Sequence, residues 1–255
     1  MTSAFNPPAA NHAKTLAITY CYGPDLRGEG PSTGQPALFI QMAGDDASNP
    51  ARDTLLSWDG SRADPTGYSR RFSIDDLVRW ALGSAGQLVV VTGGEPLDQQ
   101  DRLVVLVNEL AHFGRQVEIE TNATLVPTPR LVAATHLFVV APRLSSYDDT
   151  DADASGDERI NPAAVEAFVS SEQAVFTFAV AGEADLNEIS ALEDRFSLYP
   201  IWVTPAGSTP EKLLSTMPWL ADSILDRGWH LSSPLRMLFH GDRPPREPFP
   251  SASRP

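Results

Sequence analysis

Gln87-Leu-Val-Val-Val-Thr-Gly-Gly-Glu-Pro96 is the segment from which the architecture follows. Its short apolar run is rich in β-branched residues, which is typical of a buried strand. The glycine pair then ends the strand, and apolar side chains recur at helical spacing over residues 99–113. A second strand pattern follows at 116–121. A strand, a turn, a helix and a strand in this order predict a parallel β-α-β unit.

The same alternation extends to both sides of this unit. Ser73 followed by Asp76 predicts a capped helix start. Roughly six β/α units are too few for a closed eight-unit barrel. We therefore expect an α/β fold, a partial, open (β/α)6-type TIM barrel, with ligand sites at the carboxyl ends of its strands. The other expected elements are strands around Cys21 and at 39–44, 136–141, 174–180, 199–204 and 235–239, and helices after Pro129 and at 162–170, 183–196 and 209–227.

One domain is expected over residues 15–242. Residues 1–14 and the Pro-rich residues 243–255 carry no helix or strand pattern and are expected to be disordered. Residues 145–158 combine many aspartates with few apolar side chains, which predicts a solvated acidic loop. This loop lacks the central glycine and distal glutamate of a helix-loop-helix calcium site.

The composition excludes several classes of protein. The chain has 33 acidic and 19 basic residues and a formal net charge of -14, which disfavours a nucleic-acid partner. No apolar run approaches the roughly 20 residues that cross a bilayer, and the N-terminus lacks an apolar signal core. We therefore expect a cytoplasmic protein with no membrane partner. A single cysteine, Cys21, excludes a disulfide framework and a multi-thiolate zinc site.

The segment from Thr92 to Pro96 is the first candidate for chemistry. Its glycines let a ligand approach the backbone closely, and Glu95 is able to accept hydrogen bonds from an ammonium group. The alternative is an ordinary turn between a strand and a helix, because Gly-Gly and Glu-Pro are common turn sequences.

Four more motifs accompany this segment in order along the chain. They are Gly28-Glu-Gly-Pro31, Phe39-Ile-Gln-Met-Ala-Gly44, Asp53-Thr54 and Glu120-Thr-Asn-Ala-Thr124. Together the five motifs resemble the 7-carboxy-7-deazaguanine synthases, the QueE-type enzymes of the radical S-adenosylmethionine (SAM) class. The resemblance runs from residue 20 to residue 241. It implies a partial barrel of the radical SAM type, SAM and Mg²⁺ as ligands, 6-carboxytetrahydropterin as substrate, and a homodimer.

The resemblance also implies roles for individual residues. SAM binding falls on Thr92, Gly93, Gly94 and Glu95, and Mg²⁺ binding on Thr54 with Asp53. The substrate-binding positions that it implies are Glu29, Gln41, Glu120, Thr121, Asn122 and Arg143. Two of these depart from the family pattern, since Gln41 stands where the family has an arginine and Arg143 where it has a lysine.

The main departure concerns the iron–sulfur cluster. The family holds a [4Fe–4S] cluster on three cysteines spaced C-x3-C-x2-C, and these positions are Asp45, Asn49 and Arg52 here. Because such clusters are held by thiolates, we expect no cluster. Arg52 is then a candidate partner for the SAM carboxylate. Two other interpretations stay open for this loop: a hard divalent cation bound by its aspartates, or a solvated polar segment.

Three functions therefore compete. In the first, the chain is a cluster-free, non-catalytic binding or partner subunit that keeps a SAM- or pterin-type pocket, as a homodimer or beside an intact family member. In the second, it is a repurposed enzyme that uses SAM or a pterin without radicals. In the third, it is a 7-carboxy-7-deazaguanine synthase, as the family label states.

Overall fold

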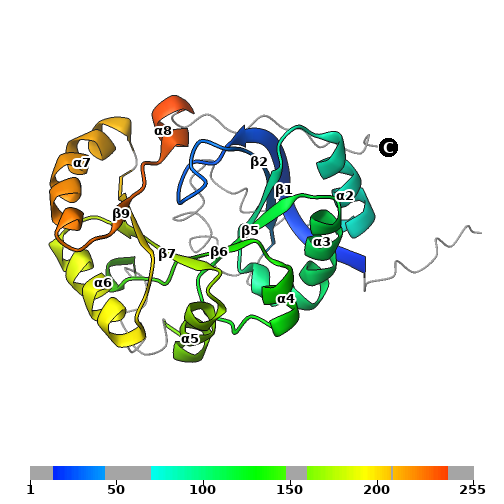
Figure 1. Cartoon of the computed structure of the whole chain (residues 1–255). Helices are drawn as coiled ribbons and strands as arrows, with labels where there is room; N and C mark the ends of the chain where they lie inside the picture. Colours follow the sequence, from blue (N-terminus) through cyan, green and yellow to red (C-terminus); the bar gives the residue numbers. More distant parts are fainter. Residues whose placement is uncertain (1–13, 44–69, 148–159, 208, 241–255) are drawn as a thin grey trace, which may run out of the picture.

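The computed structural model describes residues 14–43, 70–147, 160–207 and 209–240. Helices and strands alternate along most of this part of the chain, as the sequence predicts (Figure 1). The strands are β1 Thr15–Leu26, β2 Pro36–Met42, β3 Arg70–Ser73, β4 Leu88–Thr92, β5 Gln116–Thr121, β6 Leu137–Val140, β7 Ala174–Val180, β8 Ile201–Pro205 and β9 His230–Leu231. The helices are α2 Ile74–Gly83, α3 Gln100–His112, α4 Pro129–Ala134, α5 Pro162–Ser171, α6 Glu183–Phe196, α7 Pro210–Leu225 and α8 Leu235–His240, with the 3-10 turns η2 Pro96–Gln99 and η3 Ser145–Tyr147.

The strands form one nine-stranded sheet in the order β3-β1-β2-β4-β5-β6-β7-β8-β9. From β2 to β9 every pair is parallel, whereas β1 runs antiparallel to both β2 and β3. The helices α2 to α7 lie along one side of the curved sheet (Figure 1). In the described residues β3 and β9 are edges that do not pair with each other. The prediction of an open, partial (β/α) barrel is confirmed.

Alternate residues of the strands face opposite sides of the sheet. On β4, Val89 and Val91 belong to the large core that the helices cover, while Leu88 and Val90 belong to a second, small apolar cluster. That small cluster also contains Phe39 of β2. We call the side away from the helices the inner face of the sheet, and the candidate site lies on it.

Helix starts follow local sequence signals closely. The Ser73 side chain accepts a hydrogen bond from the Asp76 backbone N–H at the start of α2, as predicted. A capping residue followed by proline opens three more helices, because proline lacks the N–H that the first turn leaves unpaired anyway. These pairs are Thr128-Pro129, Asn161-Pro162 and Thr209-Pro210.

One predicted element is wrong. Residues 235–239 form helix α8 rather than a strand, and the last strand is the two-residue β9. The run Leu-Arg-Met-Leu-Phe is too short for its periodicity to separate a strand from a buried helix, and its leucines, arginine and methionine are good helix formers. Pro234 directly before it also suits a helix start.

Some predictions lie outside the described residues. They concern the chain ends before residue 14 and after residue 240, and the acidic segment from residue 148 to residue 159. Within the described part, none of the helices is both long and apolar enough to cross a bilayer.

Candidate ligand-binding site

Three predicted site residues form a row on the inner face of the sheet, at the carboxyl ends of neighbouring strands. Gln41 of β2 is in register with Thr92 of β4. Glu120 of β5 follows Ile119, which pairs with Val91, so Glu120 lies beside Thr92. The Thr92 hydroxyl donates a hydrogen bond to the Glu120 carboxylate. The carboxyl edge of an open α/β sheet is where ligands bind in such folds, and we call these three residues the inner-face row.

Toward the amino ends of the strands, the inner face changes from polar to apolar. Phe39 pairs with Val90, and its ring stacks on Tyr22 with centroids 4.6 Å apart. The exception is Glu118 of β5, which pairs in register with Val90 of β4 and has no exposed side-chain surface. A fully buried carboxylate is costly unless it is paired and hydrogen-bonded.

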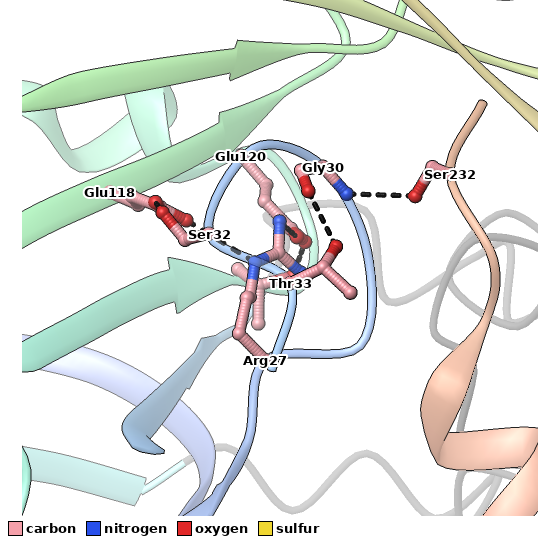
Figure 2. A network of polar contacts seen from close by, with 8 residues as sticks. Arg27, Gly30, Ser32, Thr33, Glu118, Glu120 and Ser232 are labelled. Carbon is pink, nitrogen blue, oxygen red and sulfur yellow. Dashed lines mark hydrogen bonds and ion pairs between the residues drawn. The ribbon is translucent and has the colours of Figure 1, made fainter. Parts of the chain in front are cut away.

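Arg27 supplies that pairing from the loop between β1 and β2. Its Nε lies 3.2 Å from Glu118 Oε2 and its Nη2 lies 2.7 Å from Glu120 Oε1 (Figure 2). The Ser32 hydroxyl of the same loop donates a second hydrogen bond to Glu118. Burial alone would lower the pKa of Arg27, but Glu120, Glu118 and Glu29 outweigh burial and raise this pKa. The guanidinium therefore stays charged between two carboxylates.

The loop over residues 27–35 continues from this ion pair toward the last strand. The Gly30 backbone N–H donates to Ser232 Oγ at 2.9 Å, just after β9 (Figure 2). The Leu235 N–H donates to the Gly28 carbonyl at 3.2 Å. Arg236 of α8 reaches Asp25 of β1 at 2.7 Å. Side-chain and loop contacts thus join the first and last parts of the sheet, which its strands leave unpaired.

Aromatic side chains mark the opposite part of the inner face. Trp202 of β8 is in register with Thr177 of β7 and with His230 of β9. The Trp202 and His230 rings stack with centroids 4.6 Å apart. Trp202 is half-buried and His230 is exposed, so this pair offers a ring surface to a flat ligand.

Glu29 is half-buried in the same loop, two residues after Arg27. Burial raises the pKa of the Glu29 carboxyl to about 7; Arg27 opposes this rise and Glu120 adds to it. The carboxyl group is therefore poised to exchange a proton near neutral pH.

The raised pKa of Glu29 predicts a pH effect on stability. Between the ordinary pKa of 4.5 and the folded value of about 7, the folded chain binds more protons at Glu29 than the unfolded chain. We therefore expect the free energy of unfolding to fall as the pH rises through this window. Urea denaturation at pH 5, 6 and 7.5 measures it, and the difference between wild type and Glu29→Gln isolates Glu29. Parallel pH profiles of the two proteins would contradict the pKa shift.

Glu95 and Thr121 lie away from the inner-face row. Glu95 is buried, and it accepts hydrogen bonds from the Leu97 N–H at 3.0 Å, the Asn122 N–H at 3.0 Å and the Thr121 hydroxyl at 2.8 and 2.9 Å. Burial raises its pKa, and these hydrogen bonds oppose the rise. The carboxylate joins the turn after β4 to the end of β5. An ammonium group at Glu95 would have to share oxygens that three protein donors already use.

Replacing Glu95 by glutamine tests this structural role. Either orientation of the amide points its NH2 group at one of two backbone N–H donors, so we expect a loss of about 2 kcal/mol in the free energy of unfolding. Urea denaturation measures it. Glu188→Gln is the matched control, because Glu188 also accepts hydrogen bonds from a backbone N–H and a hydroxyl, both of Ser145, but is only half-buried. Equal losses in the two variants would contradict the role of Glu95.

Gly93 brings the backbone of the turn close to β2. Its φ is +79°, and a Cβ placed there would lie 2.4 Å from Gln41 Cγ and 2.7 Å from the Met42 carbonyl oxygen. A glycine is therefore required at this point for two reasons, its left-handed conformation and its close contact with β2.

Several predicted residues are placed elsewhere or fall outside the described part. Asp45, Asn49, Arg52, Asp53 and Thr54 all fall outside it. Asn122 continues from β5 and accepts a hydrogen bond from the Thr124 N–H with its side chain, and Arg143 is half-buried in the segment after β6. Across the ranges that the structure describes, no group of three or more His, Cys, Asp or Glu side chains is placed to hold a metal ion.

The sequence interpretation missed the ion pair that organises the site. Arg27 was not proposed for the site, and Glu118 was not proposed for any role. The available signal is the strand Gln-Val-Glu-Ile-Glu-Thr, in which both glutamates alternate with apolar residues and so share a face. Two carboxylates on one face of a buried strand require a cation, but the sequence does not show which one.

Comparison with known proteins gives one consistent result. No protein-family model matches the chain. It is 31% identical to a 7-carboxy-7-deazaguanine synthase of Hyperthermus butylicus over 189 residues, which cover 74% of this chain and 75% of that protein. A protein of the same name from Pyrobaculum aerophilum is 29% identical over 221 residues, covering 85% and 91%. The crystal structure of QueE from Escherichia coli has the same fold, with a TM-score of 0.61 at 22% identity over 86% of this chain and 93% of that chain.

Proposed function

The chain belongs to the 7-carboxy-7-deazaguanine synthase family, and from this premise we propose that it binds a SAM- or pterin-type ligand without performing radical chemistry. The inner-face row of Gln41, Thr92 and Glu120 is the observation that supports ligand binding. Polar and charged side chains fill this part of the sheet where apolar side chains would pack a closed core. All three side chains are half-buried, so their polar groups lie at the surface of the carboxyl edge, where ligands bind in such folds.

The residues of the chain do not fit the [4Fe–4S] cluster that the family resemblance implies. Cys21 is the only cysteine in the sequence, and its side chain on β1 belongs to the helix-covered core with 3% of its surface exposed. Burial raises the pKa of its thiol to about 12, so the thiolate that binds iron does not form near neutral pH.

The fit to SAM is better than the fit to the cluster. The turn after β4 lies beside Thr92 of the inner-face row, and its residues Gly93 and Gly94 are half-buried rather than buried. Arg52 stays in the proposal as the partner of the SAM carboxylate, since a fixed guanidinium binds a carboxylate with two parallel hydrogen bonds. Mg²⁺ at Thr54 and Asp53 stays a proposal of the same kind.

Anaerobic purification followed by reconstitution with iron and sulfide tests the cluster. We expect less than one iron per chain, and no change in this residual iron in Cys21→Ser. Calorimetric titration with SAM and with 6-carboxytetrahydropterin tests the ligand, and we expect at least one of them to bind. Four irons per chain with turnover of 6-carboxytetrahydropterin would overturn the proposal and establish a synthase.

One observation favours a second candidate, an enzyme that uses the same ligands without radicals. The pKa of Glu29, about 7, suits a general acid or base at neutral pH, and Glu29 lies in the loop that carries Arg27. Incubation with SAM and a pterin, followed by mass spectrometry, tests this candidate. Product formation that Glu29→Gln abolishes would support it, and unchanged substrates would support the binding role.

The binding role also includes a partner. We propose that the chain pairs with itself or with an intact family member, which would supply the cluster for which this chain lacks the three cysteines. Co-expression with an intact synthase, followed by size-exclusion chromatography with light scattering, distinguishes a mixed dimer from a homodimer. A monomer in both experiments would remove the partner from the proposal.

A further inference from the structure

Among the residues that the structure describes, the charges around Arg27 are unequal. Three carboxyl groups, Glu29, Glu118 and Glu120, interact with one guanidinium, that of Arg27. Arg27 donates to Glu118 and to Glu120, so two carboxylates already balance its single charge. A ligand carboxylate that approached Arg27 would therefore compete with two carboxylates that are held in place by the fold.

The inner-face row offers mainly acceptors to a ligand. Gln41 is uncharged, and the Thr92 hydroxyl already donates a hydrogen bond to Glu120. Glu120 keeps 29% of its side-chain surface exposed, although Arg27 and Thr92 both bind it. A partly exposed, partly buried carboxylate attracts N–H donors and positive charge, and the lower local dielectric strengthens this attraction.

Glu29 adds to this imbalance from the loop. The charged groups that act on its carboxyl are Arg27 and Glu120, and Arg27 is shared with Glu118. Farther along the same contact region, Arg236 of α8 is paired with Asp25 and so contributes little net charge. The charge that Glu29 acquires on losing its proton therefore meets a guanidinium that is already neutralised.

We propose that the site selects a ligand whose group facing the inner-face row is neutral or cationic and rich in N–H donors, and disfavours a carboxylate there. Arg27 and Glu29 are then specificity-determining residues. Arg27 acts by holding Glu118 and Glu120, and Glu29 acts by its own charge. This inference rests on the proposed function, because it concerns the ligand of the same site.

A charge series on one ring system tests the proposal. The probes are 6-aminomethylpterin, 6-methylpterin and 6-carboxypterin, whose substituents are similar in size and are cationic, neutral and anionic at pH 7, where the pterin ring itself stays mostly neutral. We expect calorimetry at pH 7 to give affinities in that order, with at least roughly tenfold between the affinities for 6-aminomethylpterin and 6-carboxypterin. Raising the salt from 0.05 M to 0.5 M is expected to narrow this ratio by screening.

Two variants test which residues set the ratio of the affinity for 6-aminomethylpterin to that for 6-carboxypterin. Glu29→Gln is expected to narrow this ratio several-fold. Gln41→Arg adds a cation to the inner-face row and is expected to favour 6-carboxypterin. Glu183→Gln is the control, because it removes one negative charge at a surface site whose side chain is 58% exposed. This control is expected to leave the ratio unchanged, and a ratio that narrows equally in Glu183→Gln would overturn the proposal.

The outcomes separate the inference from the proposed function. Equal binding of the three probes, or tightest binding of 6-carboxypterin to the wild type, would overturn the selectivity and leave a pterin site in place. Failure of all three probes to bind would remove the pterin site, and the selectivity would fall with it.

Discussion

Replacing Arg27 by alanine is expected to lower the free energy of unfolding by about 4 kcal/mol. The variant leaves Glu118 without its cation at a position with no exposed side-chain surface, and it leaves Glu120 without its 2.7 Å contact. Losing one partner of a buried ion pair is costly because the other charge stays buried and uncompensated. Urea denaturation followed by tryptophan fluorescence and circular dichroism measures the loss.

Arg79→Ala is the matched control for this prediction. Arg79 pairs with Asp76 at 2.7 Å, the same distance as the contact between Arg27 and Glu120, but both of its side chains are at least half exposed. Exposed pairs contribute about 0–1 kcal/mol, so the control is expected to unfold almost like the wild type. Similar losses in both variants would show that the inner-face pair has no special role. If Arg27→Ala does not fold, Arg27→Lys keeps the charge and is expected to retain part of the stability.

The order of helices and strands was predictable because local signals and packing agree in this chain. The strands of the parallel sheet are short apolar runs: on β4, for example, Val89 and Val91 pack in the helix-covered core, and Leu88 and Val90 are buried in the small cluster of the inner face. Capping residues before prolines mark several helix starts in the sequence itself. The last element, α8, shows the limit, because five apolar or amphipathic residues fit a strand and a helix equally well.

The site was predictable only where it depends on neighbouring residues. The turn at Gly93 and the polar ends of β4 and β5 are local features, and the structure places Gln41, Thr92 and Glu120 side by side. The pairing of Arg27 with Glu118 joins residues 91 positions apart. Such a contact depends on how the loop after β1 crosses the inner face, and local patterns carry no information about that path.

The separation of Glu95 from the inner-face row has the same cause. In the sequence, Glu95 stands three residues after Thr92, and both were predicted to bind one ligand. The structure turns the chain at Gly93, so that Glu95 reaches Thr121 while Thr92 reaches Glu120. Thr121 and Glu120 are adjacent in β5 and therefore point to opposite sides of the sheet. One motif thus supplies a carboxylate that joins two strand ends and a hydroxyl that belongs to the candidate site.

Gly93→Ala is expected to destabilise the chain by about 3 kcal/mol, for two additive reasons. The first is the φ of +79°, which an L side chain adopts only with strain. The second is steric, since the new Cβ would lie 2.7 Å from the Met42 carbonyl oxygen and 3.0 Å from the Met42 nitrogen. Gln41 can move its side chain away, but the backbone of β2 is held by its pairing with β4 and cannot.

Gly114→Ala separates the two reasons. Gly114 has nearly the same φ, +77°, yet a Cβ placed there meets nothing within 4 Å. In the same urea denaturation experiment, the free energy of unfolding of this control is therefore expected to fall only by the cost of the left-handed backbone conformation, about 1 kcal/mol. The excess of the Gly93 variant over the control measures how tightly the turn packs on β2. An excess near zero would mean that the backbone of β2 moves to make room for the new Cβ. The position of Gln41 beside Thr92 would then not require a glycine at residue 93.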